Sequence, residues 1–228
     1  FPPSEELFGA VRRLNEAGRI DEMPGFAEGD WWVQDAAATL PALLLGDVAG
    51  QSVIDLCAAP GGKTMQLAAR GAKVTAVEID AARGTRIREN LARTKLDADI
   101  VQADARDFEG TAPFVLIDAP CTGSGTWRRR PDAKWKLGLE QMAQRTGEQR
   151  NILADGMRFV KPGGVLAYIT CSILSDENDD QIEALRAAHP EFTPLDAAML
   201  WREAFGDAAP PKITANGLLS KSPSVPPM

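Results

Sequence analysis

Short runs of apolar residues alternate along this chain with segments whose apolar positions recur every three or four residues. An apolar run of strand length indicates a buried strand, whereas the recurring spacing indicates a helix with one buried face. The predicted strands span residues 52–57, 73–79, 99–104, 113–118 and 164–171. The predicted helices span residues 34–45, 62–70, 81–94, 139–160 and 176–189. Strands that alternate with helices imply crossover connections, so we expect an α/β fold whose central sheet is mostly parallel and covered by helices on both faces.

The N-terminal part of the chain has a weaker pattern. Leu7, Val11 and Leu14 recur at helical spacing and predict a short amphipathic helix over residues 4–17. The helix predicted next along the chain contains Pro41, which should bend that helix or end its first turn. Proline has this effect because it lacks an N–H group and its ring clashes with the preceding turn.

The periodic signal also fades after Phe192. Residues 206–228 are rich in proline and serine, so they predict a loop or a poorly ordered, shortened tail. We therefore expect an N-terminal remnant or connector over residues 1–30, one α/β domain over residues 31–205, and the tail.

Composition excludes several classes of protein. The 228 residues suffice for one large domain with a sizeable core, and a hydrophobic fraction of 44% is ordinary. No apolar run approaches the roughly 18 residues of a membrane span, and the start, Phe1-Pro-Pro, lacks both a signal sequence and an initiator methionine. Three widely spaced cysteines predict free thiols in a reducing compartment, and the lone His189 offers no zinc cluster. We expect a cytoplasmic monomer without a metal, cut from a longer protein.

Charge is distributed unevenly. The net charge of −7 argues against a nucleic-acid binder, because such domains are usually basic. One segment departs from this balance, and its basic and aromatic residues are Trp127, Arg128, Arg129, Arg130, Lys134, Trp135 and Lys136. A charge run is usually a solvated surface loop, but Arg and Lys can hold phosphates and Trp can stack on an unpaired base. Because this segment follows Cys121 directly, we favour contact with RNA.

The first predicted strand leads into a turn of small residues that opens the next helix, in the sequence Asp55-Leu-Cys-Ala-Ala-Pro-Gly-Gly-Lys-Thr64. Small residues let a ligand approach the backbone, and the first N–H groups of a helix attract a carboxylate or a phosphate. Taken alone, the turn is as consistent with a tight strand-to-helix connection as with a cofactor site made by Ala58, Ala59, Pro60, Gly61 and Gly62. The Gly-x-Gly-x-x-Gly and P-loop patterns are absent, which argues against NAD, FAD and nucleoside triphosphates.

Two acidic residues at the ends of the following strands favour the cofactor interpretation. Glu78 ends the second predicted strand, where a carboxylate can accept two hydrogen bonds from ribose hydroxyls. Asp104 ends the third predicted strand, where it suits the amino group of adenine. Because ligands bind at the carboxyl edge of open α/β sheets, we predict an adenosyl cofactor there.

Two cysteines follow neighbouring predicted strands, in the sequences Asp118-Ala-Pro-Cys121-Thr-Gly-Ser-Gly and Thr170-Cys171-Ser-Ile. A cysteine is often only a small buried hydrophobe, and Cys57 fits that interpretation better than these two. A thiolate that adds to C6 of cytosine, with a proton delivered to N3, makes C5 able to attack an alkyl donor. Asp118 is the candidate acid or hydrogen-bond partner for N3, and Lys63 is a candidate for helping a thiol to ionise.

These three motifs resemble those of the Sun-type RNA cytosine-5 methyltransferases, whose best-known bacterial members modify 16S ribosomal RNA. The segment Gly29-Asp-Trp-Trp-Val-Gln-Asp also looks like the lead into the family's catalytic domain. The resemblance implies the Rossmann-like fold of S-adenosylmethionine-dependent methyltransferases, with S-adenosylmethionine as donor and S-adenosylhomocysteine as product. The family usually carries an N-terminal RNA-binding domain and a final Gly-Phe-Phe strand, and neither is found in this sequence.

Residue roles follow from the same resemblance. It implies that Cys171 is the nucleophile and that Cys121 helps to release the product. Asp118 would contact both the base and the methionine end of the donor, Lys63 would lie in the catalytic pocket, and Arg83 would line the donor site. Ribosomal RNA is the expected substrate and transfer RNA the alternative. A catalytically idle RNA-binding or ribosome assembly factor also stays open, although binding alone needs no thiol pair, and a small-molecule or protein methyltransferase ranks lower.

Overall fold

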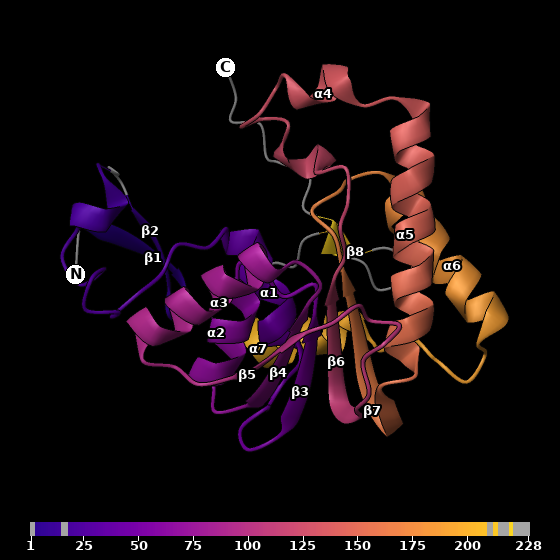
Figure 1. Cartoon of the computed structure of the whole chain (residues 1–228), viewed down its shortest axis with the longest axis horizontal. Helices are drawn as coiled ribbons and strands as arrows, with labels where there is room; N and C mark the ends of the chain where they lie inside the picture. The colour runs from indigo at the N-terminus through magenta and orange to yellow at the C-terminus, as the bar shows by residue number, and fades with distance from the viewer. Residues whose placement is uncertain (1–2, 15–17, 209–211, 214–218, 221–228) are drawn as a thin grey trace.

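A five-stranded parallel sheet forms the centre of the computed structural model, which describes residues 3–14, 18–208, 212–213 and 219–220. Its strands are β3 (Ser52–Leu56), β4 (Lys73–Glu78), β5 (Asp99–Gln102), β6 (Ala112–Asp118) and β7 (Val160–Ile169). They lie in the order β5-β4-β3-β6-β7, and every neighbouring pair is parallel (Figure 1). The chain therefore builds outward from β3 in one direction and from β6 in the other. The predicted α/β class and parallel sheet are confirmed.

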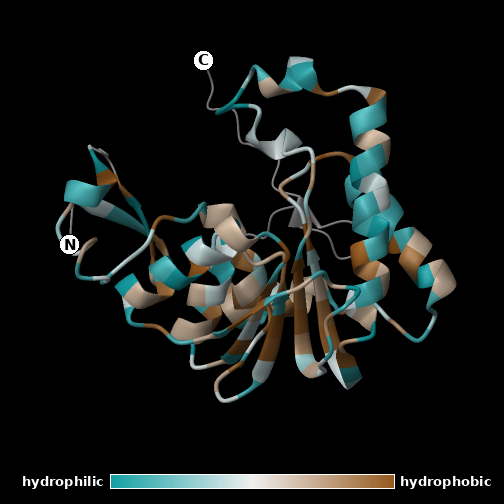
Figure 2. Ribbon diagram, viewed as in Figure 1, coloured by the Kyte–Doolittle hydropathy of each residue, from teal (hydrophilic) through white to brown (hydrophobic). Residues whose placement is uncertain are grey.

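Helices cover both faces of this sheet (Figure 1). One face carries α1 (Ala36–Leu44), α2 (Gly62–Ala69) and α3 (Ala81–Thr94), and the other carries α5 (Leu139–Met157) and α6 (Asp179–Ala188). Figure 2 shows the strands as the most hydrophobic part of the chain and the outer faces of the helices as polar. Within the described ranges, no helix has the length and apolar character that crossing a bilayer would require.

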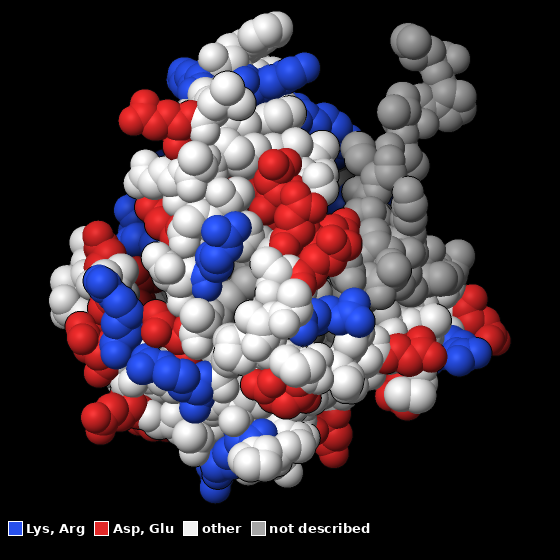
Figure 3. All heavy atoms as spheres, turned by 90° about the vertical axis from the view of Figure 1, so that its right-hand side faces the viewer, with Lys and Arg blue, Asp and Glu red and all other residues white. Residues whose placement is uncertain are grey.

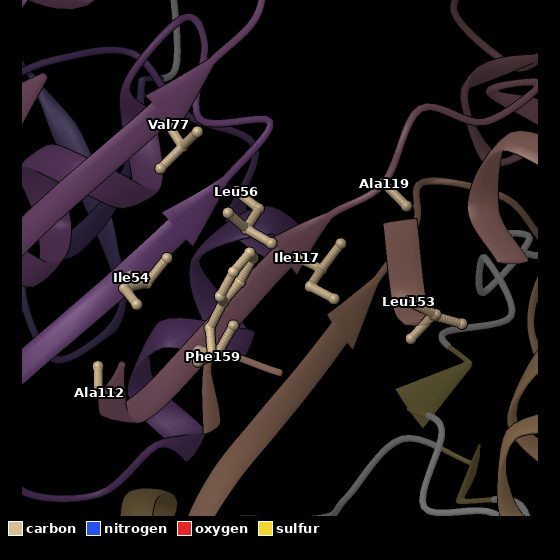
Figure 4. Packing of buried hydrophobic residues seen from close by; sticks show 9 residues of the cluster. Ile54, Leu56, Val77, Ala112, Ile117, Ala119, Leu153 and Phe159 are labelled. Atoms are coloured by element: carbon tan, nitrogen blue, oxygen red, sulfur yellow. The ribbon is translucent and has the colours of Figure 1, made fainter. Parts of the chain in front are cut away.

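Alternate residues of the central strands point to opposite faces. Val53 of β3 packs with the α1 and α2 side, whereas Ile54 and Leu56 pack with Leu153 of α5 and with Phe159 (Figure 4). Each of these side chains is less than 4% exposed, and burying one contributes about 1.5–3 kcal/mol. The apolar runs predicted as strands are thus continuous because both faces of the sheet are buried.

The helix predicted over residues 4–17 is wrong. Residues of this stretch form an antiparallel hairpin of β1 (Ser4–Phe8) and β2 (Val11–Leu14) instead. Gly9 takes a positive φ of 51° at the turn, which glycine adopts at little cost. Leu7 lies in β1, whereas Val11 and Leu14 lie in β2, so their helical spacing is coincidental. The ring of Phe8 packs edge-on against Phe205, 5.4 Å between centroids, a contact that local periodicity does not reveal.

Two further details differ from the predictions. Helix α1 continues through Pro41, so this residue does not end its first turn; the buried side chains of Leu40 and Ala42 offset one lost hydrogen bond. Helix α7 (Ala197–Phe205) lies where no element was predicted, with Asp196 accepting from the backbone N–H groups at its start. Of the predicted tail, most residues lie outside the described ranges; β8 (Lys212–Ile213) and β9 (Leu219–Ser220) pair antiparallel.

Candidate active site

Three loops meet at the carboxyl edge of the sheet, because parallel strands all end there. The cofactor loop (residues 57–62) follows β3, the first thiol loop (residues 119–126) follows β6, and the second thiol loop (residues 170–178) follows β7. Strands β3 and β6 are neighbours, and the strand order reverses between them. Clefts that bind ligands in open α/β sheets form at this kind of reversal.

The cofactor loop makes a sharp turn that two residues with positive φ permit. These are Cys57 at 59° and Gly61 at 100°. A Cβ at Gly61 would lie 3.2 Å from the side chain of Ile87, so a larger residue would be both strained and crowded. Asn90 Nδ2 donates to Pro60 O at 2.9 Å, which ties the loop to α3.

Glu78, at the end of β4, is hydrogen-bonded to the same loop. Its side chain is buried, and its carboxylate accepts from Ala59 N at 3.2 Å and from Asp80 N at 3.1 Å. Arg83 Nη1 lies 3.5 Å from Glu78 Oε1, and Arg83 Nη2 donates to Ala59 O at 3.0 Å. Because a carboxylate offers about four acceptor positions, Glu78 retains capacity for a ligand hydroxyl.

Asp104 has a partner that the sequence analysis did not foresee. Arg106 Nε and Nη2 donate to its two carboxylate oxygens at 3.1 and 2.7 Å. These hydrogen bonds hold the pKa of Asp104 below its ordinary value. Asp104 therefore lies at the predicted edge, but both of its oxygens already accept from arginine.

Asp55 is fully buried beneath the cofactor loop. Thr64 Oγ1 donates to its Oδ2 at 2.7 Å, while Oδ1 has no hydrogen-bond partner. Burial raises the pKa of Asp55 to about 7, against the opposing hydrogen bond from Thr64. An unsatisfied buried oxygen is costly in a protein. The unpaired Asp55 Oδ1, the spare acceptor capacity of Glu78 and the small residue Gly61 lie at the same edge of the sheet. These features fit a ligand that is rich in hydrogen-bond donors, such as an adenosyl group.

Lys63 and Asp118 form an ion pair between α2 and the end of β6. The distance from Lys63 Nζ to Asp118 Oδ2 is 2.7 Å. The lysine side chain is 9% exposed and the aspartate side chain 37%, so part of the carboxylate remains accessible to solvent. The sequence analysis predicted both residues for one pocket, and the geometry brings them together.

The two predicted thiols are also neighbours. Cys121 Sγ lies 3.2 Å from Cys171 Sγ. The hydrogen bond from Cys121 lowers the pKa of Cys171 to about 7, helped by Lys63 and opposed by burial and by Asp118. The same hydrogen bond, with burial, raises the pKa of Cys121. At neutral pH about half of the Cys171 side chains are thiolates, each beside a protonated thiol at Cys121.

Cys57 differs from Cys171 in the direction of its pKa shift. Burial, followed by the charge of Glu78, raises its pKa to about 12. A thiol that stays protonated at neutral pH is a poor nucleophile. The raised pKa thus makes Cys57 a weaker candidate for the nucleophile than Cys171.

Backbone and hydroxyl contacts hold the two thiol loops together. Gly125 N donates to Cys171 O at 2.9 Å, and a Cβ at Gly125 would lie only 2.6 Å from that oxygen, so this position requires glycine. Ser124 Oγ lies 2.8 Å from Ser172 Oγ and accepts from Ile173 N at 2.9 Å. The sequence analysis did not identify these serines.

The basic segment (residues 127–136) runs from the first thiol loop into α4 (Ala133–Lys136). Trp135 is 84% exposed, and Lys134 Nζ lies 5.9 and 5.6 Å from the ring centroids of Trp127 and Trp135. Figure 3 shows acidic and basic side chains interspersed over one side of the molecule, with blue atoms near the top, the end at which Figure 1 shows α4. Arg128 and Arg130 are exposed, and Arg129 pairs with Asp35.

A cavity of about 290 Å³ separates this segment from the first thiol loop. Cys121 and Thr122 line one part of it, and Lys136, Gln144 and Arg145 line another. Amide and basic side chains can hydrogen-bond base edges and phosphates. The residues that α5 contributes were missed in the sequence, because nothing local distinguishes an exposed Gln or Arg on a long helix from a solvated one.

Comparisons with known proteins agree with this arrangement. A family model described as 16S rRNA methyltransferase RsmB/F matches residues 42–206. The chain is 41% identical over 206 residues to Ribosomal RNA small subunit methyltransferase B of Sodalis glossinidius (strain morsitans), which covers 87% of this chain and 46% of the relative. The chain thus spans about half the length of the curated relatives it matches.

Solved structures with similar folds were also found. The crystal structure of PH0851 has a TM-score of 0.81 and 32% identity, over 93% of this chain and 49% of that one. The structure of NSun6 from Pyrococcus horikoshii with SFG has a TM-score of 0.70 and 27% identity, over 78% of this chain and 50% of that one. The fold is therefore similar to that of these proteins over most of this chain.

Proposed function

Because the chain belongs to the RsmB/F family of 16S rRNA methyltransferases, we propose that it transfers a methyl group from S-adenosylmethionine to C5 of a cytosine in ribosomal RNA. The observation that carries this proposal is the pair of thiols 3.2 Å apart beside the Lys63–Asp118 ion pair. Curated relatives named as ribosomal RNA small subunit methyltransferase B support the choice of RNA.

The chemistry requires a nucleophile because C5 of cytosine is too electron-poor to attack a methyl donor. Cys171 adds to C6, and a proton reaches N3, so that C5 gains the character of an enamine carbon. The lowered pKa of Cys171 supplies thiolate at neutral pH. Cys171 is also exposed, which leaves its sulfur accessible to a base turned out of its stack.

Asp118 and Lys63 serve the N3 side of the ring. The short contact between them holds a transferable proton at the edge of the cleft, 2.7 Å between the two heavy atoms. Asp118 would contact N3 and the methionine end of the donor, and Lys63 keeps that carboxylate in place and supplies positive charge beside Cys171. A positioned acid or base of this kind contributes about 10²–10⁴-fold in rate.

Cys121 serves the release step. Once Cys171 is bonded to C6, it no longer accepts a hydrogen bond as an anion, and the neighbouring negative charge that raised the pKa of Cys121 is gone. Cys121 can then lose its thiol proton to solvent and, as a thiolate, remove the proton from C5. The C6–sulfur bond breaks with its electron pair returning to Cys171, and the proton on N3 returns to Asp118. The Cys171 thiolate returns to its original hydrogen bond.

S-adenosylmethionine, when bound, supplies an electrophilic methyl group and leaves as S-adenosylhomocysteine. We assign its binding to the cofactor loop, with ribose hydroxyls at Glu78, adenine at Asp104 and Arg83 lining the site. Asp104 must share its oxygens between Arg106 and the adenine amino group. The solved structure of NSun6 from Pyrococcus horikoshii, which has a similar fold, was determined with SFG, and this supports a bound ligand in this fold.

RNA would approach over the basic segment and the cavity beside Cys121. Arg128, Arg129 and Arg130 hold phosphates, Lys134 adds charge, and Trp127 and Trp135 offer stacking surfaces. We propose residues 31–205 as the catalytic domain and residues 1–30 as a connector. The protein would act in the cytoplasm, where ribosomal RNA is assembled into ribosomes. It would act as a monomer.

Methylation of unmodified RNA tests the proposal. The chain is incubated with radiolabelled S-adenosylmethionine and either 16S ribosomal RNA or transfer RNA, both transcribed in vitro. Label in 5-methylcytosine from the ribosomal RNA, abolished in Cys171→Ala, is the expected result. Label only in transfer RNA contradicts the substrate. Label in a nucleoside other than 5-methylcytidine contradicts methyl transfer to C5 of cytosine.

A further inference from the structure

The carboxylate of Glu177 is fully buried between the two thiol loops, although the residue belongs to an acidic run. Its Oε1 accepts from Thr122 N at 2.8 Å, and its Oε2 accepts from Thr122 Oγ1 at 2.5 Å. Thr122 directly follows Cys121, and Glu177 lies six residues beyond Cys171. A single side chain thus joins the segments that carry the two thiols.

Other elements fix this carboxylate in place. Gln149 Nε2 on α5 donates both to Glu177 Oε1 and to Pro120 O, each at 2.9 Å. Tyr168 Oη on β7 donates to the backbone oxygen of Glu177, also at 2.9 Å. Burial alone would raise the pKa of Glu177, but hydrogen bonds from Ser172, Thr122 and Gln149 lower it, so the group stays ionised. A buried charge is tolerated when it is hydrogen-bonded to this extent.

We propose that Glu177 is a positioning residue, whose carboxylate holds the first thiol loop against the second so that Cys121 can donate a hydrogen bond to Cys171. The proposal rests on the catalytic roles proposed above for the two thiols. Glu177 does not touch the reacting atoms. It acts through Thr122, one residue from Cys121, and through the turn that it shares with the second thiol loop.

The hydrogen bonds of Glu177 indicate which substitutions distinguish the effect of its hydrogen-bonding shape from the effect of its negative charge. In Glu177→Gln the amide oxygen can accept from Thr122 N and Gln149, while the amide N–H donates to Thr122 Oγ, because a hydroxyl both donates and accepts. Glu177→Ala loses these contacts and the hydrogen bond from Ser172, and it leaves their donors unpaired. A role in positioning therefore predicts a large defect in the alanine variant and recovery in the glutamine variant.

The test measures the reactivity of Cys171 without RNA or donor. Iodoacetamide alkylation of the Cys171 peptide is followed by mass spectrometry from pH 5.5 to 9.5, in wild type, Glu177→Ala, Glu177→Gln and Thr122→Val. The ionisable groups that face Cys171 are Cys121 from the first thiol loop, Lys63 from α2 and Asp118 from β6. Glu203→Ala, an exposed glutamate on α7, is the matched control.

In the wild type the Cys171 pKa is expected near 7, and Glu177→Ala should move it toward the value of about 8.5 for a free thiol. The alkylation rate at pH 7 would then fall by up to about 15-fold, since the thiolate fraction falls from about one half to about 3%. Glu177→Gln and Glu203→Ala should stay within about threefold of wild type, and Thr122→Val should lie between the extremes.

A methylation assay gives the second readout. In Glu177→Ala the turnover number should fall about 100-fold with S-adenosylmethionine affinity unchanged, as a displacement of about 1 Å can cause. An unchanged Cys171 profile in Glu177→Ala overturns the proposal, and so does a glutamine variant as impaired as alanine. If Glu177→Ala does not fold, a wild-type profile in Thr122→Val overturns it. Because alkylation needs neither RNA nor donor, a shifted profile supports positioning even if the RNA is not methylated.

Discussion

Lys63 and Asp118 are separated by 55 residues in sequence and by 2.7 Å between Nζ and Oδ2 in the fold. Lys63 lies in the first turn of the helix that follows the cofactor loop, and Asp118 ends the strand that precedes the first thiol loop. This ion pair therefore joins the donor side of the cleft to the thiol side. The 2.7 Å contact fixes the positions of the ammonium and carboxylate groups, and the role of each residue depends on that position as well as on its charge.

Removing one partner of this pair should impair the chemical step. We expect Lys63→Met and Asp118→Asn each to lower the single-turnover rate of methyl transfer by about 10²–10³-fold, because N3 loses its positioned proton and Cys171 loses a nearby cation. Rapid-quench measurement with saturating donor and RNA gives the rate. Lys73→Met, at an exposed lysine of β4, should react as the wild type does. A wild-type rate in Asp118→Asn would contradict the assigned role.

The rate should depend on pH through Cys171. A pKa lowered to about 7 means that the thiolate is present above pH 7 and is lost as the pH falls below that value. The single-turnover rate of adduct formation should therefore rise through a midpoint near pH 7 and level off by about pH 8. In Cys121→Ala the hydrogen bond that lowers this pKa is missing, so the midpoint should move upward. A downward movement would show that Cys121 does not stabilise the thiolate.

Glu78 should matter more than Asp104 for binding of S-adenosylmethionine. A hydrogen bond to a charged group is worth about 1.5–3 kcal/mol, so Glu78→Gln should weaken donor affinity by about 10–100-fold in calorimetric titration. Asp104→Asn should have a smaller effect, because Arg106 already engages both of its oxygens. Glu89→Gln, at an exposed position of α3, is the control. Equal losses at Glu78 and Glu89 would mean that the ribose does not bind where we assign it.

Neutralising the arginines of the basic segment should weaken RNA binding alone. With Arg128, Arg129 and Arg130 changed to alanine, the affinity for ribosomal RNA should fall at least about tenfold, with a shallower dependence on salt, because fewer phosphates are neutralised. Affinity for S-adenosylmethionine should be unchanged. Gel shifts over a series of salt concentrations measure the effect. An equal loss after changing the exposed Arg86, Arg88 and Lys161 would indicate only an effect of net charge.

The sequence predicts the parts of this fold whose signal is local. Apolar runs, and the small residues between Cys57 and Gly62, mark strands and a strand-to-helix turn wherever they occur. Since parallel strands end at one edge, the juxtaposition of Cys121 with Cys171 and of Lys63 with Asp118 follows from topology. The N-terminal hairpin does not, because its choice over a helix depends on packing against α7.

Local patterns in the sequence do not reveal hydrogen-bond partners whose side-chain orientation is set by the fold. The Arg106 side chain that engages Asp104 lies only two residues away, but its orientation is set by the turn after β5. Glu177 belongs to an acidic run that composition assigns to solvent, yet this one member points inward to Thr122. Burial of a single carboxylate depends on donors from other elements, here the first thiol loop and α5, which no local pattern encodes.

The most direct test of the account is to trap the covalent intermediate. Wild type, Cys121→Ala and Cys171→Ala are each mixed with unmodified 16S ribosomal RNA and S-adenosylmethionine, then resolved on a denaturing gel. Cys121→Ala should accumulate a slowly migrating protein–RNA species, because Cys171 still attacks C6 while the release step fails, and Cys171→Ala should give none. A species formed by Cys171→Ala and absent from Cys121→Ala would reverse the roles of the two thiols and contradict the account.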